Sequence, residues 1–301
     1  MRGGVLRTGG GRIRLGWRLL LWAVAVLALA LGTAILVPAT RLPWVSLPLL
    51  VAGLGAGWLL LSLDGRPPGE LGFRLSRSAP AEAGKGTALG VTVGLAAVAA
   101  MAAAGGVRWT GDEGSLAAWT AMGAAALWSL ALPAAAEEAL LRGYPLRALA
   151  EAWGGAVAVV LTSVTFALLH AANPDVGLAG LLNVAVAGVF LGALALRTGS
   201  LWWASGAHLG WNWAHAFLAD LPVSGYELMD APLLEPVLRG PSWVSGGRFG
   251  PEGSLVVTAV LAGAAAWTWR TRHLGPVPGA PSWRGASPPP EDRPGATGVL
   301  S

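Results

Sequence analysis

The stretch LAAWTAMGAAALWSLALPAAAEEALLRGY, residues 116–144, places two carboxylates and an arginine directly after a long apolar run. An apolar run of about twenty residues is long enough to cross a bilayer as a helix. Ionisable groups at membrane depth are costly unless they are paired or solvated, so their presence points to function. Glu137, Glu138 and Arg142 are therefore the first candidates for a functional site.

The composition favours a membrane protein. Of 301 residues, 54% are hydrophobic and only 12% are charged, whereas soluble domains carry about 25% charged residues. The absence of cysteine excludes disulfides, cysteine proteases and thiolate metal sites. A net charge of +4 is too small and too scattered to indicate nucleic-acid binding, and basic residues in such a chain more often set membrane orientation.

Apolar runs recur along the chain at intervals that suit membrane-spanning helices. They lie near residues 15–37, 45–63, 86–105, 115–136, 154–172, 178–196, 200–219 and 254–272. The sequence therefore predicts an all-α polytopic membrane protein with about eight transmembrane helices, in which the central four form the catalytic core.

Connections that are rich in basic residues alternate with connections that are poor in them. This alternation predicts that both termini are cytoplasmic and that the chain crosses the plasma membrane several times. The connection 64–85 is expected to be structured or interfacial. The predicted divisions are an N-terminal arm (1–14), N-terminal helices with a cytoplasmic loop (15–114), a catalytic core (115–220), an extracytoplasmic loop with the last helix (221–272), and a disordered tail (273–301).

The motif EEALLR, residues 137–142, separates its two carboxylates in direction. Glu138 and Arg142 are four apart in the order that favours an ion pair on a helix. Glu137 points about 100° away and is free to face something else. Pro133 is expected to allow a break just before the carboxylates. The alternative is a helix that emerges into the cytoplasm with ordinary charges.

The motif FALLH, residues 166–170, places Phe166 one turn below His170 on the same helix face. The alternative is a structural histidine at a helix end. Trp153-Gly154-Gly155 is typical of a turn between two helices. Glu137 and His170 lie at about equal distances from this turn, roughly 25 Å at 1.5 Å per residue, so an antiparallel hairpin would bring them to the same depth.

The motif HLGWN, residues 208–212, places His208 and Asn212 on one helix face. Counted from the expected start of their helix, they lie about 12 and 18 Å deep, and Asn183 falls near the same level on the preceding helix. For Asn183 and His215 we favour interhelical hydrogen bonding over a part in chemistry, because polar side chains commonly join helices in membranes.

Glu137, His170, His208 and Asn212 come from separate helices and are predicted to meet at one depth. A carboxylate with imidazoles can activate water, and Asn with His can donate hydrogen bonds to a developing oxyanion. The same carboxylate and two histidines could instead hold zinc, with one position open for water. Serine hydrolysis fits less well, because no serine has the context of a nucleophile elbow.

EEALLR, FALLH and HLGWN resemble, in this order, the motifs EExxxR, FxxxH and HxxxN of the CPBP family, the CAAX-protease and bacteriocin-processing membrane proteins. The resemblance covers about residues 115–220, and three motifs in order on separate predicted helices make it specific. It implies a polytopic intramembrane endopeptidase similar to the type II CAAX prenyl endopeptidases.

The resemblance also implies roles for the motif residues. Glu137 matches the catalytic carboxylate, and His170 matches the histidine that helps it activate water. His208 and Asn212 match the pair assigned to the oxyanion. The remaining two motif residues are expected to support the site rather than to react: Glu138 and Arg142.

No cofactor is firmly predicted, and zinc held by Glu137, His170 and His208 stays open as the metal-dependent alternative. We lean to a metal-free mechanism because the sequence lacks two histidines one turn apart in an HExxH arrangement. The expected partners are a peptide or protein substrate, with lipidation left open, and membrane lipids. The alternatives are CAAX-type or bacteriocin-related processing, a non-proteolytic scaffold or immunity protein, and a transporter that uses the same polar residues.

Overall fold

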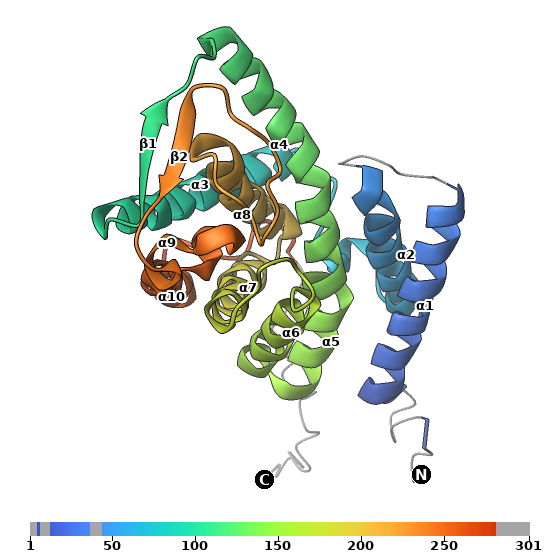
Figure 1. Ribbon diagram of the computed structural model, residues 1–301. Coiled ribbons are helices and arrows are strands. Elements are labelled where there is room, and N and C mark those ends of the chain that lie inside the picture. Colours follow the sequence, from blue (N-terminus) through green and yellow to red (C-terminus); the bar gives the residue numbers. More distant parts are fainter. Residues whose placement is uncertain (1–4, 7–12, 37–43, 281–301) are drawn as a thin grey trace, which may run out of the picture.

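The computed structural model describes residues 5–6, 13–36 and 44–280, and they form a bundle of helices (Figure 1). The long helices are α1 (Leu15–Leu36), α2 (Leu47–Leu63), α3 (Ala79–Ala103), α4 (Leu116–Glu138), α5 (Tyr144–Trp153), α6 (Gly155–Leu169), α7 (Leu178–Thr198), α8 (Leu201–Trp213) and α10 (Leu255–Arg270). The shorter elements are α9 (Ser242–Ser245), strands β1 (Val107–Gly111) and β2 (Leu234–Leu238), and several single turns.

Each of the eight predicted apolar runs is helical, and the all-α polytopic fold is confirmed. Within the described residues, five helical segments are long and apolar enough to cross a membrane: Leu15–Leu36, Trp44–Leu63, Ala79–Ala103, Leu116–Trp153 and Leu178–Thr198. The other three predicted runs correspond to the shorter helices α6, α8 and α10. Helix α3 begins at Ala79 and not at the predicted residue 86, so the last part of the predicted connection 64–85 is helical.

The expected break at Pro133 is wrong. Helix α4 continues through Pro133 to Glu138, and the irregularity follows as a π-helical turn, η3, at Ala139–Gly143. Proline is tolerated inside membrane helices when the surroundings satisfy the freed backbone groups. Pro145, in the first turn of α5, lacks the N–H that a regular α-helix would direct at Leu141. The α-helical ladder is therefore interrupted within the motif EEALLR rather than before it.

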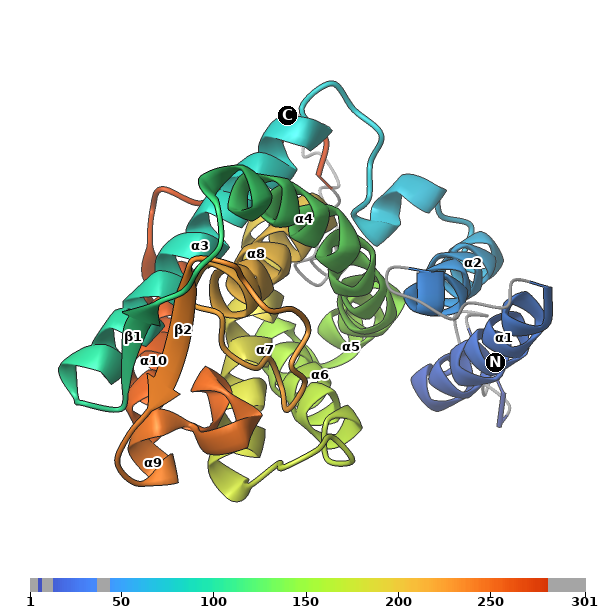
Figure 2. The ribbon, with the colours of Figure 1, turned by 45° about the horizontal axis from the view of Figure 1, so that its top comes forward.

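Helices α3 and α8 run side by side, with α3 on the outer side of α8 (Figure 2). Their contact is made by glycines: a Cβ on Gly90 would lie 2.0 Å from the Ala207 carbonyl oxygen, and one on Gly210 would lie 2.2 Å from the Thr87 carbonyl oxygen. Small residues at four-residue spacing let two membrane helices approach backbone to backbone. This packing holds α8, which carries His208 and Asn212, directly against α3.

Gly90→Ala should therefore destabilise the protein. The added methyl group would have to push the two backbones apart, and overpacking of this kind costs about 1–3 kcal/mol. Gly84→Ala on the same helix is the matched control, because a Cβ there meets nothing within 4 Å. Thermal unfolding in detergent should show a lower midpoint for G90A only. Equal midpoints for the two variants would contradict the close packing.

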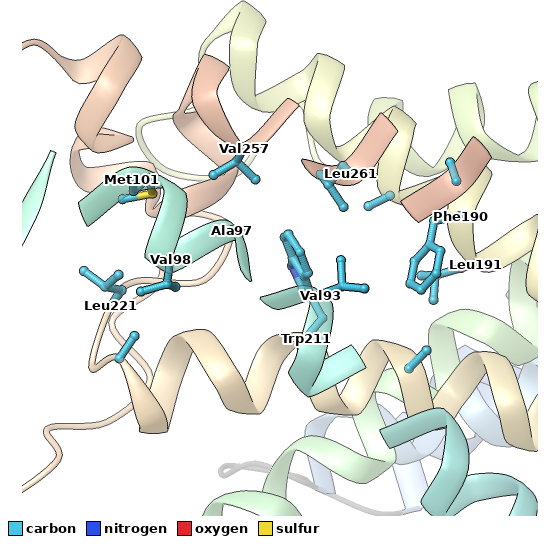
Figure 3. Close-up of a cluster of buried hydrophobic side chains, with 14 of the residues drawn as sticks. Val93, Ala97, Val98, Met101, Phe190, Leu191, Trp211, Leu221, Val257 and Leu261 are labelled. Atoms are coloured by element: carbon cyan, nitrogen blue, oxygen red, sulfur yellow. The ribbon is translucent and has the colours of Figure 1, made fainter. Parts of the chain in front are cut away.

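A cluster of apolar side chains joins α3, α7, α8 and α10 (Figure 3). Met101 and Val93 come from α3, Phe190 from α7, and Leu261 from α10, and Trp211 of α8 projects among them. Burial of such side chains contributes about 1.5–3 kcal/mol each. The half of the bundle that carries the HLGWN motif is thus also its main apolar core.

Helices α1 and α2 form a pair at one side of the bundle (Figure 1). Of the most apolar stretch of α1, 0% is buried inside the protein, as expected of a helix whose surface faces lipid. Buried polar contacts fix one end of α1: Arg18 Nη2 pairs with Asp64 at 2.5 Å, and Arg18 Nε donates to the Tyr144 hydroxyl at 2.7 Å. Arg18 lies within an apolar run but belongs to none of the three motifs, so the sequence did not mark it as part of such a contact.

The segment between α8 and α10 is more structured than a simple loop. β2 pairs with β1 in an antiparallel register that joins Val107 to Leu238 and Gly111 to Leu234. Of the predicted tail, residues 273–280 are described and pack on the end of α7, where Arg197 donates to the Leu274 carbonyl and Val277 N–H donates to the Thr198 carbonyl. The arm residues 1–4 and 7–12 and the tail residues 281–301 lie outside the described ones.

Asp220, just after α8, gives a pH-dependent contribution to stability. Burial, followed by the nearby acidic side chains, raises its pKa from 3.8 to about 6, against one hydrogen bond from the Ala231 N–H. The folded protein therefore binds the proton more tightly than the unfolded chain. The stability contributed by this group is greatest below pH 3.8 and is lost as the pH rises to about 6.

Asp220→Asn should therefore raise the unfolding midpoint at pH 7.5 and change it less at pH 4.5. The amide keeps an oxygen that can accept the Ala231 N–H, and it carries no charge at either pH. Thermal unfolding of both proteins at the two pH values checks this. A gain that is larger at pH 4.5 would contradict the sign of the shift.

Candidate active site

One cavity of about 810 Å³ is lined by residues from all three motifs, although Glu138 and Arg142 of the first motif are not among them. Glu137, His170, His208 and Asn212 all line it. They arrive from the end of α4, the end of α6 and the middle of α8. Four side chains from three helices thus line one cavity, and among them Glu137 and His208 approach to 3.7 Å. The roles assigned to these side chains stay predictions.

The two adjacent glutamates face different surroundings, as the helical angle predicts. The side chain of Glu138 is 0% exposed, whereas that of Glu137 is 36% exposed. Glu137 Oε2 is nevertheless buried and has no hydrogen-bond partner among the described residues. An ionised carboxylate oxygen without a donor is a strong acceptor, so Glu137 offers a base to whatever enters the cavity.

Arg142 holds the second carboxylate, as predicted. Its Nη1 donates to Glu138 Oε1 at 3.1 Å, and its Nη2 donates to the Gly188 carbonyl of α7 at 3.3 Å. The guanidinium also lies over the Phe166 ring, 4.5 Å from its centroid. Arg142 lies in the π-helical turn η3. The backbone is therefore irregular at the residue whose side chain contacts α4, α6 and α7.

His208 lies between the two carboxylates. Its Nδ1 donates to Glu138 Oε1 at 3.0 Å, and its Nε2 lies 3.7 Å from Glu137 Oε2. The carboxylate of Glu138 can only accept, so Nδ1 carries a proton and the ring orientation is fixed. Glu138 thus supports the site through two contacts, one to Arg142 and one to His208.

His170 ends α6 and is oriented by its own helix. A carbonyl oxygen can only accept, so Nδ1–H donates to the Phe166 carbonyl at 2.8 Å. In the neutral ring, Nε2 is then free to accept a hydrogen bond. The Phe166 and His170 rings meet edge to face, with centroids 4.6 Å apart, rather than in a parallel stack. The expected contact within FALLH is therefore present.

The two polar residues set apart from the chemistry behave differently. Asn183 joins helices as expected, because its Nδ2 donates to the Glu252 carbonyl at 2.7 Å and to the Ser254 carbonyl at 2.8 Å. For His215 no hydrogen bond of ordinary geometry is found among the described residues, although its ring faces the Gly94 backbone of α3. Both its ring nitrogens lack a partner among the described residues, and it packs on the Trp211 ring at 4.2 Å instead.

The zinc alternative needs ligand atoms that can reach one ion. Among the described residues, the group of three whose ligand atoms lie within 4.8 Å of one another is Asp220, Asp230 and Glu235. Glu137, His170 and His208 do not form such a group. Since tetrahedral zinc takes ligands at about 2.0–2.2 Å, these three side chains as placed do not fit one shared ion.

The comparisons with known proteins agree with the motifs. Residues 118–214 match the family described as type II CAAX prenyl endopeptidase Rce1-like. Over these residues the chain is similar to that family. The match contains all three motifs, confirms the resemblance seen in the sequence, and indicates a membrane protease that acts on a peptide or protein substrate. No curated protein and no solved structure matches the chain.

Sequence reasoning missed part of the wall of the cavity. Glu252, Ser224 and Trp211 line it together with the Rce1-like motif residues. Two of them lie beyond the matched segment, in the connection 219–254. One signal was available: Glu252 is a carboxylate just before an apolar run, as Glu137 is a carboxylate just after one, and both positions are ends of apolar segments.

Proposed function

We propose that the protein is an intramembrane endopeptidase in which Glu137 activates water for attack on a peptide bond. The observation that carries this proposal is the unpartnered Glu137 Oε2, 3.7 Å from His208 Nε2, in a cavity that His170 and Asn212 also line. A water molecule placed there would meet a base, two imidazoles and an amide.

The proposed reaction follows from the hydrogen-bonding capacity of each group. Glu137 takes a proton from water, and the oxygen attacks the carbonyl carbon of the peptide bond. His170 Nε2 accepts a hydrogen bond from the same water and orients it. Asn212 donates its amide N–H to the oxyanion, and His208 donates from Nε2 when that atom is protonated. Glu137 then returns the proton to the leaving amine.

We propose further that catalysis does not require a metal ion. The ligand atoms of Glu137, His170 and His208 are too dispersed for one ion, and each of the proposed proton transfers has a group that performs it. The substrate is expected to be a membrane-bound peptide. The cavity supports this because Trp22 and Val26 of α1 and Leu49 of α2 give it an apolar wall on the side of the α1–α2 pair.

The test is cleavage by the purified protein in detergent. Matched peptides with and without a prenylated cysteine near the C-terminus are incubated with it, and products are identified by mass spectrometry. We expect new C-termini from at least one peptide, and unchanged rates after treatment with a strong metal chelator. Loss of activity on chelation, restored by zinc, would overturn the metal-free mechanism. No cleavage, together with solute flux in proteoliposomes, would favour the transporter alternative.

A further inference from the structure

Glu252 is a buried carboxylate outside the three motifs. It is 5% exposed, lies in the turn Pro251–Gly253 before α10, and lines the same cavity as Glu137. No arginine or lysine among the described residues pairs with it. A buried carboxylate is retained only where hydrogen bonds satisfy its oxygens, so the partners of Glu252 show what it holds in place.

The partners come from three separate parts of the fold. Trp211 Nε1 of α8 donates to Glu252 Oε1 at 3.0 Å, and the Ser224 hydroxyl donates to Oε2 at 2.5 Å. The backbone carbonyl of Glu252 accepts from Asn183 of α7 at 2.7 Å. Hydrogen bonds to a charged carboxylate are stronger than neutral ones. Glu252 therefore ties α7, α8 and the segment 220–226 to the start of α10.

Two of these connections end next to predicted catalytic residues. Trp211 directly precedes Asn212 on α8, and its ring is held in the apolar core of the bundle (Figure 3). Ser224 is held in the left-handed region, with φ 50°, and its carbonyl accepts from Asn173 at 3.0 Å. Asn173 in turn follows His170 by one turn, where its N–H donates to the His170 carbonyl.

The segments that carry Asn173 and Ser224 are closely packed against each other. A Cβ on Gly225 would lie 2.1 Å from the Pro174 carbonyl oxygen, and the Gly225 N–H donates to the Phe249 carbonyl. A shift of the 220–226 segment would therefore be passed on to the turn after His170. Misplacement of a reacting group by about 1 Å can cost about 10²-fold in rate.

We propose that Glu252 is a positioning residue of the active site, which sets the placement of Asn212 through Trp211 and of His170 through Ser224 and Asn173. This inference rests on the proposed function. It assigns no bond-making step to Glu252, whose oxygens are both occupied by donors from the protein itself.

The chain provides a matched control in Glu82. Glu82 is also buried, at 7% exposed, and also accepts two hydrogen bonds: from Ser78 at 2.6 Å and from Ser200 at 2.6 Å. It joins α3 to the start of α8 and does not line the cavity. Glu82→Ala and Glu252→Ala thus remove equivalent carboxylates, and only one of them lies at the candidate site.

The experiment compares E252A, E82A and E252Q with the full-length protein in detergent. E252A should lower kcat by at least about 10-fold with little change in KM, on the scale that loss of a supporting hydrogen bond has elsewhere. E82A should lower the unfolding midpoint but keep kcat. E252Q should recover most of kcat, since its amide can accept from Trp211 and donate to the Ser224 hydroxyl.

Hydrogen–deuterium exchange gives a readout that does not depend on activity. E252A should increase exchange in segments 170–177 and 220–226, and E82A should not. Wild-type kcat and wild-type exchange in E252A would overturn the inference while leaving the proposed function intact. Equal losses of kcat in E252A and E82A would overturn it in favour of a general effect on stability. A wild-type protein that cleaves no peptide would remove the proposed function, and the inference with it.

Discussion

Glu137→Gln is expected to lower kcat by about 10²- to 10⁴-fold, the range that general-base catalysis supplies. The amide has the size and shape of the carboxylate but cannot take a proton from water. Substrate binding should change little, because the loss falls on the transition state rather than on the ground state. Steady-state cleavage of the best peptide, measured for both proteins at equal concentration, gives kcat and KM separately.

The fold should be unaffected by this substitution. Glu137 Oε2 has no hydrogen-bond partner among the described residues, so an amide in its place breaks no hydrogen bond of that atom, and its 3.7 Å approach to His208 Nε2 is the contact that changes. The unfolding midpoint of E137Q should therefore equal that of the wild type. Glu113→Gln is the control for the loss of one carboxylate, since Glu113 is exposed and does not line the cavity. A folded E137Q protein with wild-type kcat would refute the assignment of Glu137 as base.

Arg142→Met is expected to destabilise the protein by about 3–5 kcal/mol, the cost of leaving a buried charge without its partner. The side chains of Arg142 and Glu138 are both 0% exposed, so water cannot replace the lost guanidinium. The substitution also removes the hydrogen bond to the Gly188 carbonyl and the contact with the Phe166 ring. The free energy of unfolding is measured by titration with denaturing detergent in mixed micelles.

A double-mutant cycle separates the pair from these other contacts. Glu138→Gln in the R142M background removes the stranded charge and should recover part of the lost stability. The double variant should then be more stable than R142M alone. If R142M loses no stability, or if the double variant is the least stable of the four proteins, the pair does not hold the bundle together in the way proposed here.

Much of the fold could be predicted from hydropathy, because a chain in lipid must satisfy the hydrogen bonds of its backbone N–H and C=O groups within each helix. The apolar runs located eight of the nine long helices of the described residues, all except α5, and the helical angle between Glu137 and Glu138 correctly separated a partly exposed carboxylate from a buried one. The break at Pro133 was wrong because a proline shows only that a hydrogen bond is lost. It does not show where the backbone will become irregular.

The part of the site that the sequence did not predict depends on contacts between distant segments. Glu252 is 115 residues from Glu137 along the chain, and no periodicity relates the two. Its place in the cavity follows from the course of the connection 219–254 between α8 and α10. The glycines of the α3–α8 contact did carry a signal, since Gly86, Gly90 and Gly94 repeat at the four-residue spacing of closely packed membrane helices.

The glycine contact between α3 and α8 has a consequence for motion. Side chains that interdigitate can change rotamer and let two helices slide, but at Gly90 and Gly210 the backbones themselves meet, and a backbone has no alternative rotamer. The two helices must therefore travel as a single rigid body. A rearrangement that admits a substrate is therefore expected in other elements, such as the α1–α2 pair, which forms an apolar wall of the cavity.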